Sequence, residues 1–256
     1  MLKKLTQQEI PAYAHACAYE RVFGSKAMTA LRAYGLESES NEFYLCAESG
    51  EPTAALYLSD GVLIVSSNER ADAEEIAALI RRKRVGETDT NWSQCAALQA
   101  ILGGVTESSY YMVYAGGPQE RADPDIRPGA LPDMFRVLRQ SHEYYRTHLK
   151  YESWAADLER KRERGLVELY QLELDGKAVG TGSIASEDEE CGVIAAVAVV
   201  PEYRHRGLGS RISRFLVGRI QEKGRTPRLI SGYDEVAELY RRIGFIPCGR
   251  WGELYL

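Results

Sequence analysis

The chain has 256 residues, 45% of them hydrophobic and 27% charged, and its formal net charge is −5. This composition is typical of a globular protein and argues against wholesale disorder, and the length suits one large domain or two ordinary ones. The negative net charge argues against a general nucleic-acid-binding protein.

Other features limit the location and the chemistry. No stretch approaches the roughly 18 consecutive apolar residues of a membrane span, and the first 15 residues lack the apolar core of a secretory signal. The five cysteines are scattered and form no C-x-x-C pair, which is typical of reduced thiols in the cytoplasm. The four histidines have no metal-ligand spacing. We therefore expect a cytoplasmic protein with no metal, and neither a membrane nor a nucleic acid as partner.

The first half of the sequence predicts a meander of strands followed by helices. Turn signals at Ser49–Pro52 and Asp60-Gly61 separate three short apolar runs. The predicted elements are strands at 43–47, 53–58, 62–66 and 110–114 and helices at 71–84 and 92–102.

Residues 115–125 combine glycine, proline and charge without apolar periodicity, which predicts a boundary. Beyond it, the run 193–200 is almost continuously apolar, so we expect a strand that is buried on both faces. The predicted elements of this half are helices at 131–147, 153–164, 208–222 and 235–242 and strands at 166–174, 178–185, 193–200, 228–231 and 245–256.

The two halves resemble each other, because each runs from a hairpin through a third strand into a helix. We expect two similar domains, at 1–120 and 126–256, each of the α/β class with a mixed, mainly antiparallel sheet flanked by helices. Residues 1–125 carry 11 basic and 18 acidic residues, a net charge of −7, whereas residues 126–256 carry 21 and 19, a net charge of +2. The second domain is therefore the better candidate for binding an anionic ligand.

The most specific passage is Val197–Ser210, which reads VAVVPEYRHRGLGS. An apolar strand ends at a proline, a loop follows, and a helix begins near Leu208. A helix start offers unpaired N–H groups and partial positive charge, and Gly207 and Gly209 leave room for a phosphate to approach them. Four arginines surround the turn. The alternative is a glycine-capped loop with solvated arginines, but the combination favours a pyrophosphate site. The arginines are Arg204, Arg206, Arg211 and Arg214.

This passage resembles the GNAT superfamily of N-acetyltransferases, whose signature Arg/Gln-x-x-Gly-x-Gly/Ala is matched by Arg204–Gly209 and whose preceding V-A-V-x-P is matched by Val197–Pro201. The resemblance implies the GNAT acyl-CoA N-acyltransferase fold, duplicated with a degenerate N-terminal half, and acetyl-CoA as cosubstrate. It implies that one strand pairs with the pantetheine arm and polarises the thioester carbonyl, while the loop amides hold the pyrophosphate. The implied cofactor-binding residues are Val197, Ala198, Val199, Arg204, His205, Arg206, Gly207, Leu208, Gly209 and Ser210.

A second family motif, Asn-x-x-Ala-x-x-Leu-Tyr-x-x-x-Gly-Phe, resembles residues 233–245. Leu239, Tyr240 and Gly244-Phe245 match it in register, whereas Tyr233 stands where asparagine is usual. The resemblance implies that Tyr240 is the catalytic acid that donates a proton to the departing CoA thiolate. The alternative is a helix tyrosine that packs against the sheet.

The general base is left open. An amine acceptor with a pKa near 10.4 must lose a proton before it attacks, and histone-type family members carry a glutamate on the strand where this chain has Val193. A water relay is one alternative. The others are the glutamates nearby in sequence, namely Glu168, Glu173, Glu189 and Glu190.

The first half has no comparable phosphate site. Its strand–helix junction places Asp72, Glu74 and Glu75 at the helix start, where carboxylates satisfy the dipole and repel phosphate. We expect this half to bind no CoA and to provide an acidic wall for a cationic acceptor. The alternative is a packing partner that only stabilises the fold.

The function that these patterns and the resemblance imply is transfer of an acetyl or short acyl group from acetyl-CoA to a primary amine of a small molecule or peptide. Two alternatives stay open: a non-catalytic CoA-binding regulatory module, and an N-acyltransferase for an amino acid such as glycine. Tyr144, Tyr145 and Tyr151 are expected either to line the acceptor pocket or to pack in the core.

Overall fold

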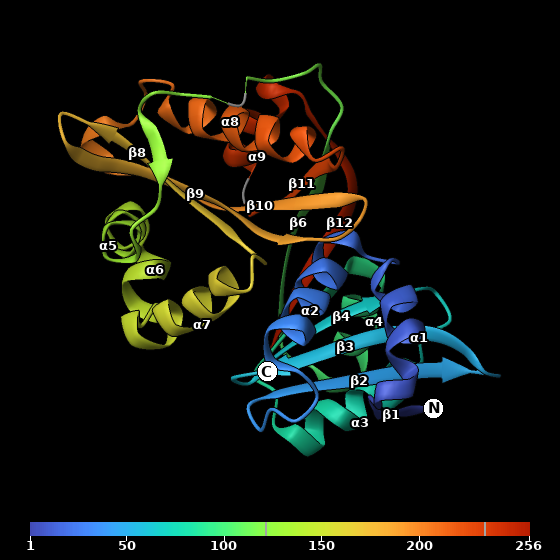
Figure 1. Ribbon diagram of the computed structural model, residues 1–256. Helices are drawn as coiled ribbons and strands as arrows, with labels where there is room; N and C mark the ends of the chain where they lie inside the picture. The colour runs from blue at the N-terminus through green and yellow to red at the C-terminus, as the bar shows by residue number, and fades with distance from the viewer. Residues whose placement is uncertain (121, 233) are drawn as a thin grey trace. The chain divides into compact units, whose positions relative to one another are not determined.

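The computed structural model describes residues 1–120, 122–232 and 234–256 (Figure 1). The chain forms two compact units, each described here by itself. Unit 1 contains residues 1–112, 230–234 and 247–256, and unit 2 contains residues 113–229 and 235–246. Among the described residues, no helix is both long and apolar enough to cross a membrane.

Unit 1 is built on a sheet with the strand order β1-β2-β3-β4-β5-β12-β6. The β4–β5 pair is parallel, and β1 through β4 and the β5–β12 pair are antiparallel. The elements are β1 (Leu2–Lys4), α1 (Ile10–Cys17), α2 (Arg21–Tyr34), β2 (Asn41–Glu48), β3 (Glu51–Ser59), β4 (Val62–Ser67), α3 (Ala73–Lys83), β5 (Glu87–Asn91), α4 (Trp92–Leu102), β6 (Val105–Tyr114) and β12 (Phe245–Tyr255).

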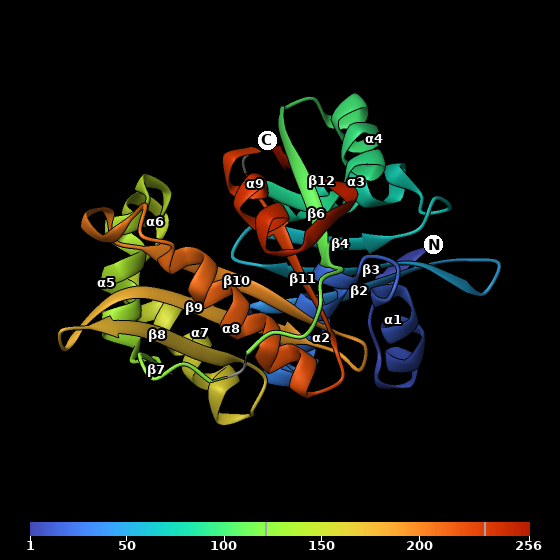
Figure 2. The ribbon, with the colours of Figure 1, turned by 90° about the horizontal axis from the view of Figure 1, so that it is seen from above.

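Helices cover both faces of this sheet, α1 and α2 on one side and α3 and α4 on the other (Figures 1 and 2), and its alternating side chains bury two apolar layers. Phe43, Leu45 and Ala55 pack against α1 and α2, and their neighbours Tyr44 and Leu56 pack against α3 and α4. This period of two is the expected pattern for a strand that is covered on both faces. Helices α1 and α2 were not among the predicted elements, whereas α3 and α4 lie close to their predicted ranges.

Two hairpins turn where the glycine signals predicted them, at Ser49-Gly50 and at Asp60-Gly61, and a third turns at Asp175-Gly176. Both central residues have positive φ in each of the three, as a type I′ turn requires. The meanders in both halves are therefore encoded locally.

The last strand of the chain is a component of unit 1. Residues 251–255 of β12 pair with residues 87–91 of β5 in antiparallel register. The contact units therefore differ from the proposed domains 1–120 and 126–256, because the hydrogen bonds of β12 join the C-terminus to a strand of the first half. A linear reading of composition does not reveal such a long-range pairing.

Unit 2 has the strand order β11-β10-β9-β8-β7, with β10–β11 parallel and the other pairs antiparallel. Helices α5 and α8 pack on β9 and β10 from opposite sides (Figure 1). The elements are β7 (Ile126–Pro128), α5 (Leu131–Ser141), α6 (Glu143–His148), α7 (Tyr151–Glu163), β8 (Glu168–Leu174), β9 (Lys177–Glu187), β10 (Cys191–Val199), a 3-10 turn at Pro201–Tyr203, α8 (Leu208–Glu222), β11 (Thr226–Ser231) and α9 (Asp234–Ile243).

Both units repeat one order of elements: a three-stranded meander, a helix, and a strand that pairs in parallel with the third strand. In unit 1 the repeat runs from β2 to β5, and in unit 2 from β8 to β11. The predicted α/β class, the mainly antiparallel mixed sheet and the duplication are confirmed.

Two predictions about unit 2 need correction. The helix expected at 131–147 is broken at His142, whose extended backbone (φ −151°) ends α5 and caps α6. The strand expected to be buried on both faces is buried only from Cys191 to Ile194, and four of the next five residues are partly exposed. Its apolar sequence therefore does not reflect complete burial.

Small residues allow α8 to lie close to the sheet. A Cβ on Gly180 or Gly182 would come within 2.6 or 2.7 Å of Ile212 side-chain carbons, and a Cβ on Gly192 would come within 2.8 Å of Ile220. This close packing fixes the axis of α8 against β9 and β10, and thereby the position of its N-terminus.

Candidate functional site

The end of β10 is irregular where the sequence predicts contact with a ligand. Its register against β9 shifts between Ala195 and Ala198, and Ala196 has a φ of +53°. A non-glycine residue in this region is strained, and such strain is concentrated at functional sites. Val197 lies in this bulge, while Ala198 and Val199 regain register with Thr181 and Gly180.

The bulge lies beyond the paired part of β10 and β11. Their parallel register joins Cys191–Val193 to Thr226–Arg228, so it ends before the bulge begins. Val197 and Val199 are partly exposed there. The structure therefore places the two valines predicted to bind the pantetheine arm on an accessible part of the strand.

A tight loop leads from β10 into α8. His205 and Gly207 both have left-handed backbone conformations, with φ of 60° and 76°. Gly207 is the N-cap of α8, and neither a capping side chain nor an acidic residue occupies the first turn. Since the first N–H groups of a helix have no intrahelical acceptor, the amides from Leu208 to Ser210 are available to an anion.

The two signature glycines serve different purposes. At Gly207 the positive φ disfavours any side chain. Gly209 has ordinary backbone geometry, and among the described residues a Cβ there would meet only Leu239 Cδ1, at 3.6 Å. The fold tolerates a side chain at 209, so its absence leaves space in front of the helix start.

Arg204 holds the loop in place. Its Nε donates a hydrogen bond to the carbonyl of Val199 (3.1 Å), and its guanidinium also donates to the carbonyl of Ser141. Ser141 is the last residue of α5, where a cation is favoured by the helix dipole. The side chain of the signature arginine thus joins β10 to α5.

The side chains of the other three arginines contact different partners. Arg206 lies over the Tyr203 ring (4.9 Å) and donates to the Glu202 carbonyl, and Arg214 donates to Gln119. Arg211 pairs with Asp123 (2.5 Å) and Asp125 (2.6 Å). Hydrogen bonds to these two carboxylates raise the pKa of Arg211. All four arginines were expected to add positive charge for a phosphate. Arg211 does not, because two carboxylates of the linker (residues 115–125) neutralise it.

The second motif converges on the same helix start. Tyr240 of α9 is buried, with 7% of its surface exposed, and its ring makes an edge contact with Phe245. Burial raises the pKa of Tyr240 above its ordinary value, the nearby Tyr145 hydroxyl raises it further, and a hydrogen bond with Ser213 lowers it in part. Tyr240 is therefore a protonated phenol across the physiological pH range.

Ser213 lies beside both the tyrosine and the open start of α8. Its hydroxyl donates to the Gly209 carbonyl at 2.8 Å, and its interaction with the Tyr240 phenol lowers the pKa of that group in part. Sequence reasoning missed Ser213, although it lies four residues after Gly209, which places both on one face of a helix. Tyr145, for which two roles were open, lies near Tyr240 rather than in the core, and it is partly exposed.

None of the glutamates considered as bases is suited to the role. Val193 is 1% exposed and supplies no carboxylate. Glu189 and Glu190 precede β10, and at about 3.3 Å per residue they lie roughly 30 Å along the strand from Val199 at its far end. Burial alone would raise the pKa of Glu168, but hydrogen bonds from Lys223 and Tyr170 lower it overall, and Glu173 pairs with Arg127. Tyr233 of the second motif lies outside the described residues.

The corresponding helix start in unit 1 is closed, in the sense that a side chain already caps its first amides. Asp72 is the N-cap of α3, and its carboxylate accepts from the amides of Glu74 (2.9 Å) and Glu75 (3.3 Å). The first turn thus contains three carboxylates and has two of its amides satisfied. This geometry matches the expected contrast between the two helix starts.

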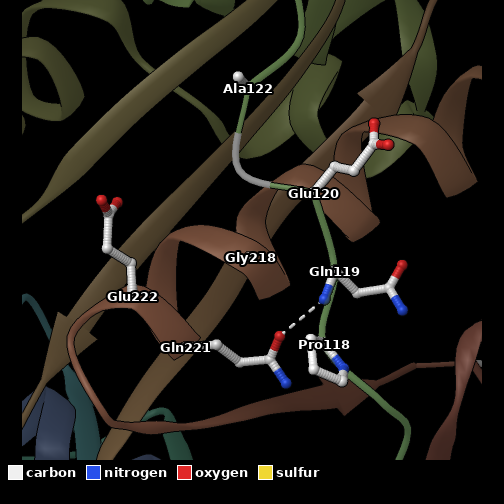
Figure 3. A pocket seen from close by; sticks show the side chains of 7 residues that line it. All are labelled: Pro118, Gln119, Glu120, Ala122, Gly218, Gln221 and Glu222. Atoms are coloured by element: carbon white, nitrogen blue, oxygen red, sulfur yellow. Dashed lines mark hydrogen bonds between the residues drawn. The ribbon is translucent and has the colours of Figure 1, made fainter.

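A surface pocket of about 540 Å³ lies elsewhere on unit 2, between the linker and the C-terminal part of α8 (Figure 3). The Gln119 amide donates to Gln221 Oε1 at 3.0 Å, and a Cβ on Gly218 would come within 2.5 Å of the Glu120 carbonyl. The linker is therefore held closely against the helix. The pocket is lined by Pro118, Gln119, Glu120, Ala122, Gly218, Gln221 and Glu222.

Part of the chain matches a known protein family, and the whole chain resembles several solved structures. Residues 131–245 match the acetyltransferase (GNAT) family. A tandem GNAT protein from the clavulanic acid biosynthesis pathway shares the fold with a TM-score of 0.62 at 13% identity, over 99% of this chain and 97% of that chain. No match was found among curated proteins.

Two further solved structures show the same fold. A GCN5-related N-acetyltransferase from Kribbella flavida has a TM-score of 0.63 at 14% identity, over 93% of this chain and 95% of that chain. Another, from Sphaerobacter thermophilus, has a TM-score of 0.62 at 16% identity, over 99% and 94%. These likenesses concern the fold alone.

Proposed function

Because this chain belongs to the GNAT acetyltransferase superfamily, with residues 131–245 matching the family, we propose that it transfers an acetyl or short acyl group from acetyl-CoA to a primary amine. The observation that carries the proposal is the convergence of two motifs in unit 2. The uncapped start of α8 and the protonated Tyr240 are joined through Ser213.

The residues around the helix start suit acetyl-CoA as cosubstrate. Open space in front of Gly209 and an uncapped first turn provide a cradle for a diphosphate. In this proposal the amides of His205–Ser210 bind the pyrophosphate, and the backbone of Val197 and Val199 pairs with the pantetheine arm. Arg204 contributes by holding the loop rather than by contacting phosphate, since its side chain is already bonded to two carbonyls.

The proposed reaction is direct attack in a ternary complex. The amine nitrogen forms a bond to the thioester carbonyl carbon, and backbone amides in the bulge at Ala196–Ala198 stabilise the developing oxyanion. As the carbon–sulfur bond breaks, Tyr240 donates its phenolic proton to the thiolate. The proton of the acceptor ammonium passes to water, because no carboxylate replaces Val193 on the strand.

The acceptor in this proposal is a cationic amine of a small molecule or peptide. Residues 1–125 carry a net charge of −7, and a field of that sign attracts ammonium groups and repels anionic acceptors. Tyr145 and the exposed ring of Tyr144, which stacks on His148, offer aromatic surface on α6 for such an acceptor.

The test is thioester turnover by the full chain with a panel of amines, followed by mass-spectrometric identification of acetylated products from a metabolite extract. We expect acetyl-CoA binding in calorimetry and amine-dependent release of CoA. Binding without turnover on any amine would instead support a CoA-binding regulatory module. Turnover with glycine but not with diamines or lysine-like amines would support an amino-acid acyltransferase.

A further inference from the structure

Unit 1 contains a cluster of three carboxylates on the paired strands β5 and β12. Asp89 of β5 and Glu253 of β12 are directly opposite each other in the antiparallel register, and Glu87 is opposite Tyr255 one step along. Like charges directly opposite on paired strands destabilise a sheet. A positive charge bound between these side chains would offset the repulsion.

The carboxylate of Asp89 has a free oxygen. Its Oδ1 is buried and has no hydrogen-bond partner among the described residues. Burial raises the pKa of Asp89 to about 6, against a lowering by Lys26. An unsatisfied buried oxygen in a native structure needs an explanation, and an ion that the oxygen binds is one of the few available.

Neither Tyr255 nor Lys26 bonds to the partnerless oxygen of Asp89. Tyr255 donates a hydrogen bond to Glu253 at 2.9 Å, and Glu107 of β6 adds a further negative charge near Glu253. Lys26 of α2 is a nearby cation, but its Nζ lies over the Phe23 ring, 5.5 Å from the centroid. Since Asp89 Oδ1 has no partner, Lys26 does not bond to it.

The geometry suits one metal ion. One carboxylate oxygen each from Glu87, Asp89 and Glu253 lies within 4.8 Å of the other two. An ion with metal–oxygen distances of about 2.3–2.6 Å spans at most about 4.6–5.2 Å between opposite ligands, so a Ca²⁺-sized ion can contact all three. All three residues are partly exposed, which leaves a path for a hydrated ion.

We propose that Glu87, Asp89 and Glu253 form a binding site for a hard divalent cation of the size of Ca²⁺, which fastens the C-terminal strand β12 to β5. Carboxylate oxygens are the donors that hard cations such as Ca²⁺ and Mn²⁺ prefer, whereas soft metals prefer sulfur donors. The site lies within unit 1, and its existence does not depend on the proposed acetyl transfer.

The test measures calcium binding to the full chain by calorimetry and thermal unfolding in chelator-treated buffer. We expect calorimetry to show binding with a stoichiometry of about one ion per chain. We also expect calcium to raise Tm and EGTA to reverse the rise, since a ligand that binds the folded state stabilises it. Asp89→Asn and Glu253→Gln should each abolish the calcium-dependent shift. Glu51→Gln, an exposed acid on β3, is the matched control and should retain it.

Three outcomes would overturn the site. The first is the absence of a calcium- or manganese-dependent shift in the wild-type chain. The second is an equal shift in the wild type and in both cluster variants, which would place the ion elsewhere. The third is a Tm rise with spermidine but not with either metal, which would identify the cluster as a site for organic ammonium groups. Two variants are used so that a folding failure of one leaves the test intact.

Discussion

The helix starts of α3 and α8 occupy equivalent places in the repeat, and they differ in what satisfies their amides. In α3 the carboxylate of Asp72 accepts from two first-turn amides, and Glu74 and Glu75 follow. In α8 the N-cap is Gly207 and no acid is present in the first turn. The same fold thus contains one helix start whose first amides are bonded to its own N-cap side chain and one whose first amides have no such cap. In the proposed function, these few side chains, and not the fold, decide which unit accepts a phosphate.

The catalytic part of this contrast is tested most strongly by Tyr240→Phe. We expect turnover to fall by about 10²–10⁴-fold, because the phenol supplies the proton to the leaving thiolate, while acetyl-CoA affinity changes little. Steady-state kinetics and calorimetry measure the two effects. The control is Tyr255→Phe in unit 1, which also removes a phenol that makes a hydrogen bond, in this case to the Glu253 carboxylate. Unchanged turnover where chemistry limits the rate would remove Tyr240 from the mechanism.

The open helix start is tested by Gly209→Glu. A Cβ at this position meets Leu239 Cδ1 at 3.6 Å, an ordinary contact, so the fold should persist, but the new carboxylate would repel the diphosphate and take up its space. We expect acetyl-CoA affinity to fall at least ~100-fold, or about 2.7 kcal/mol. The control Gly117→Glu adds the same charge in the same unit, at a position where a Cβ has no atom of the described residues within 4 Å. This variant should bind acetyl-CoA as tightly as the wild type.

The same titration tests the comparison between the units. We expect one acetyl-CoA per chain, because α3 presents carboxylates where α8 presents free amides. A stoichiometry of two, or an affinity that survives Gly209→Glu, would contradict the assignment of the cofactor to unit 2.

The link between the two motifs is tested by Ser213→Ala. We expect kcat to fall by roughly tenfold while the Kd for acetyl-CoA stays within a few-fold, because the phenol loses the hydroxyl that orients it. Ser213→Thr keeps the hydroxyl and should restore part of the rate. Since the pKa of Tyr240 is already raised and losing this bond raises it further, neither protein should show an alkaline loss of rate below about pH 10. Equal kcat in the alanine variant would show that Ser213 does not position Tyr240.

The closed helix start is tested by Asp72→Ala, the smallest expected effect. Loss of the N-cap should lower the free energy of unfolding by about 0.5–2 kcal/mol, measured by urea denaturation, and leave acetyl-CoA affinity unchanged. Glu74→Gln, which keeps the cap, should change stability by less than about 0.5 kcal/mol. A gain of acetyl-CoA binding on removing Asp72 alone would mean that the cap is what closes this site.

The strands of the two meanders and the turns between them were predictable because their signals are local, whereas β1, β5 and β7 were not predicted. Glycine-bearing dipeptides fixed the hairpins, alternating apolar residues fixed the meanders, and the residue pattern of Arg204–Gly209 was enough to identify the loop. In contrast, α1 and α2 were not predicted, and the break at His142 was hidden inside an apparently continuous helical pattern. The backbone of His142 is extended there although neither proline nor glycine marks the position.

The amino-acid sequence by itself determined the α/β class, the duplicated order of elements, and which half has an open helix start. These features depend on side chains that are close in sequence to the backbone they act on. Only the tertiary structure showed that β12 pairs with β5, that Ser213 joins Tyr240 to Gly209, that linker carboxylates neutralise Arg211, and that Asp89 is opposite Glu253. Each of these is a contact between residues that are separated in the chain or lie on different elements. Strand register and helix packing bring them together, and neither is specified by local propensity.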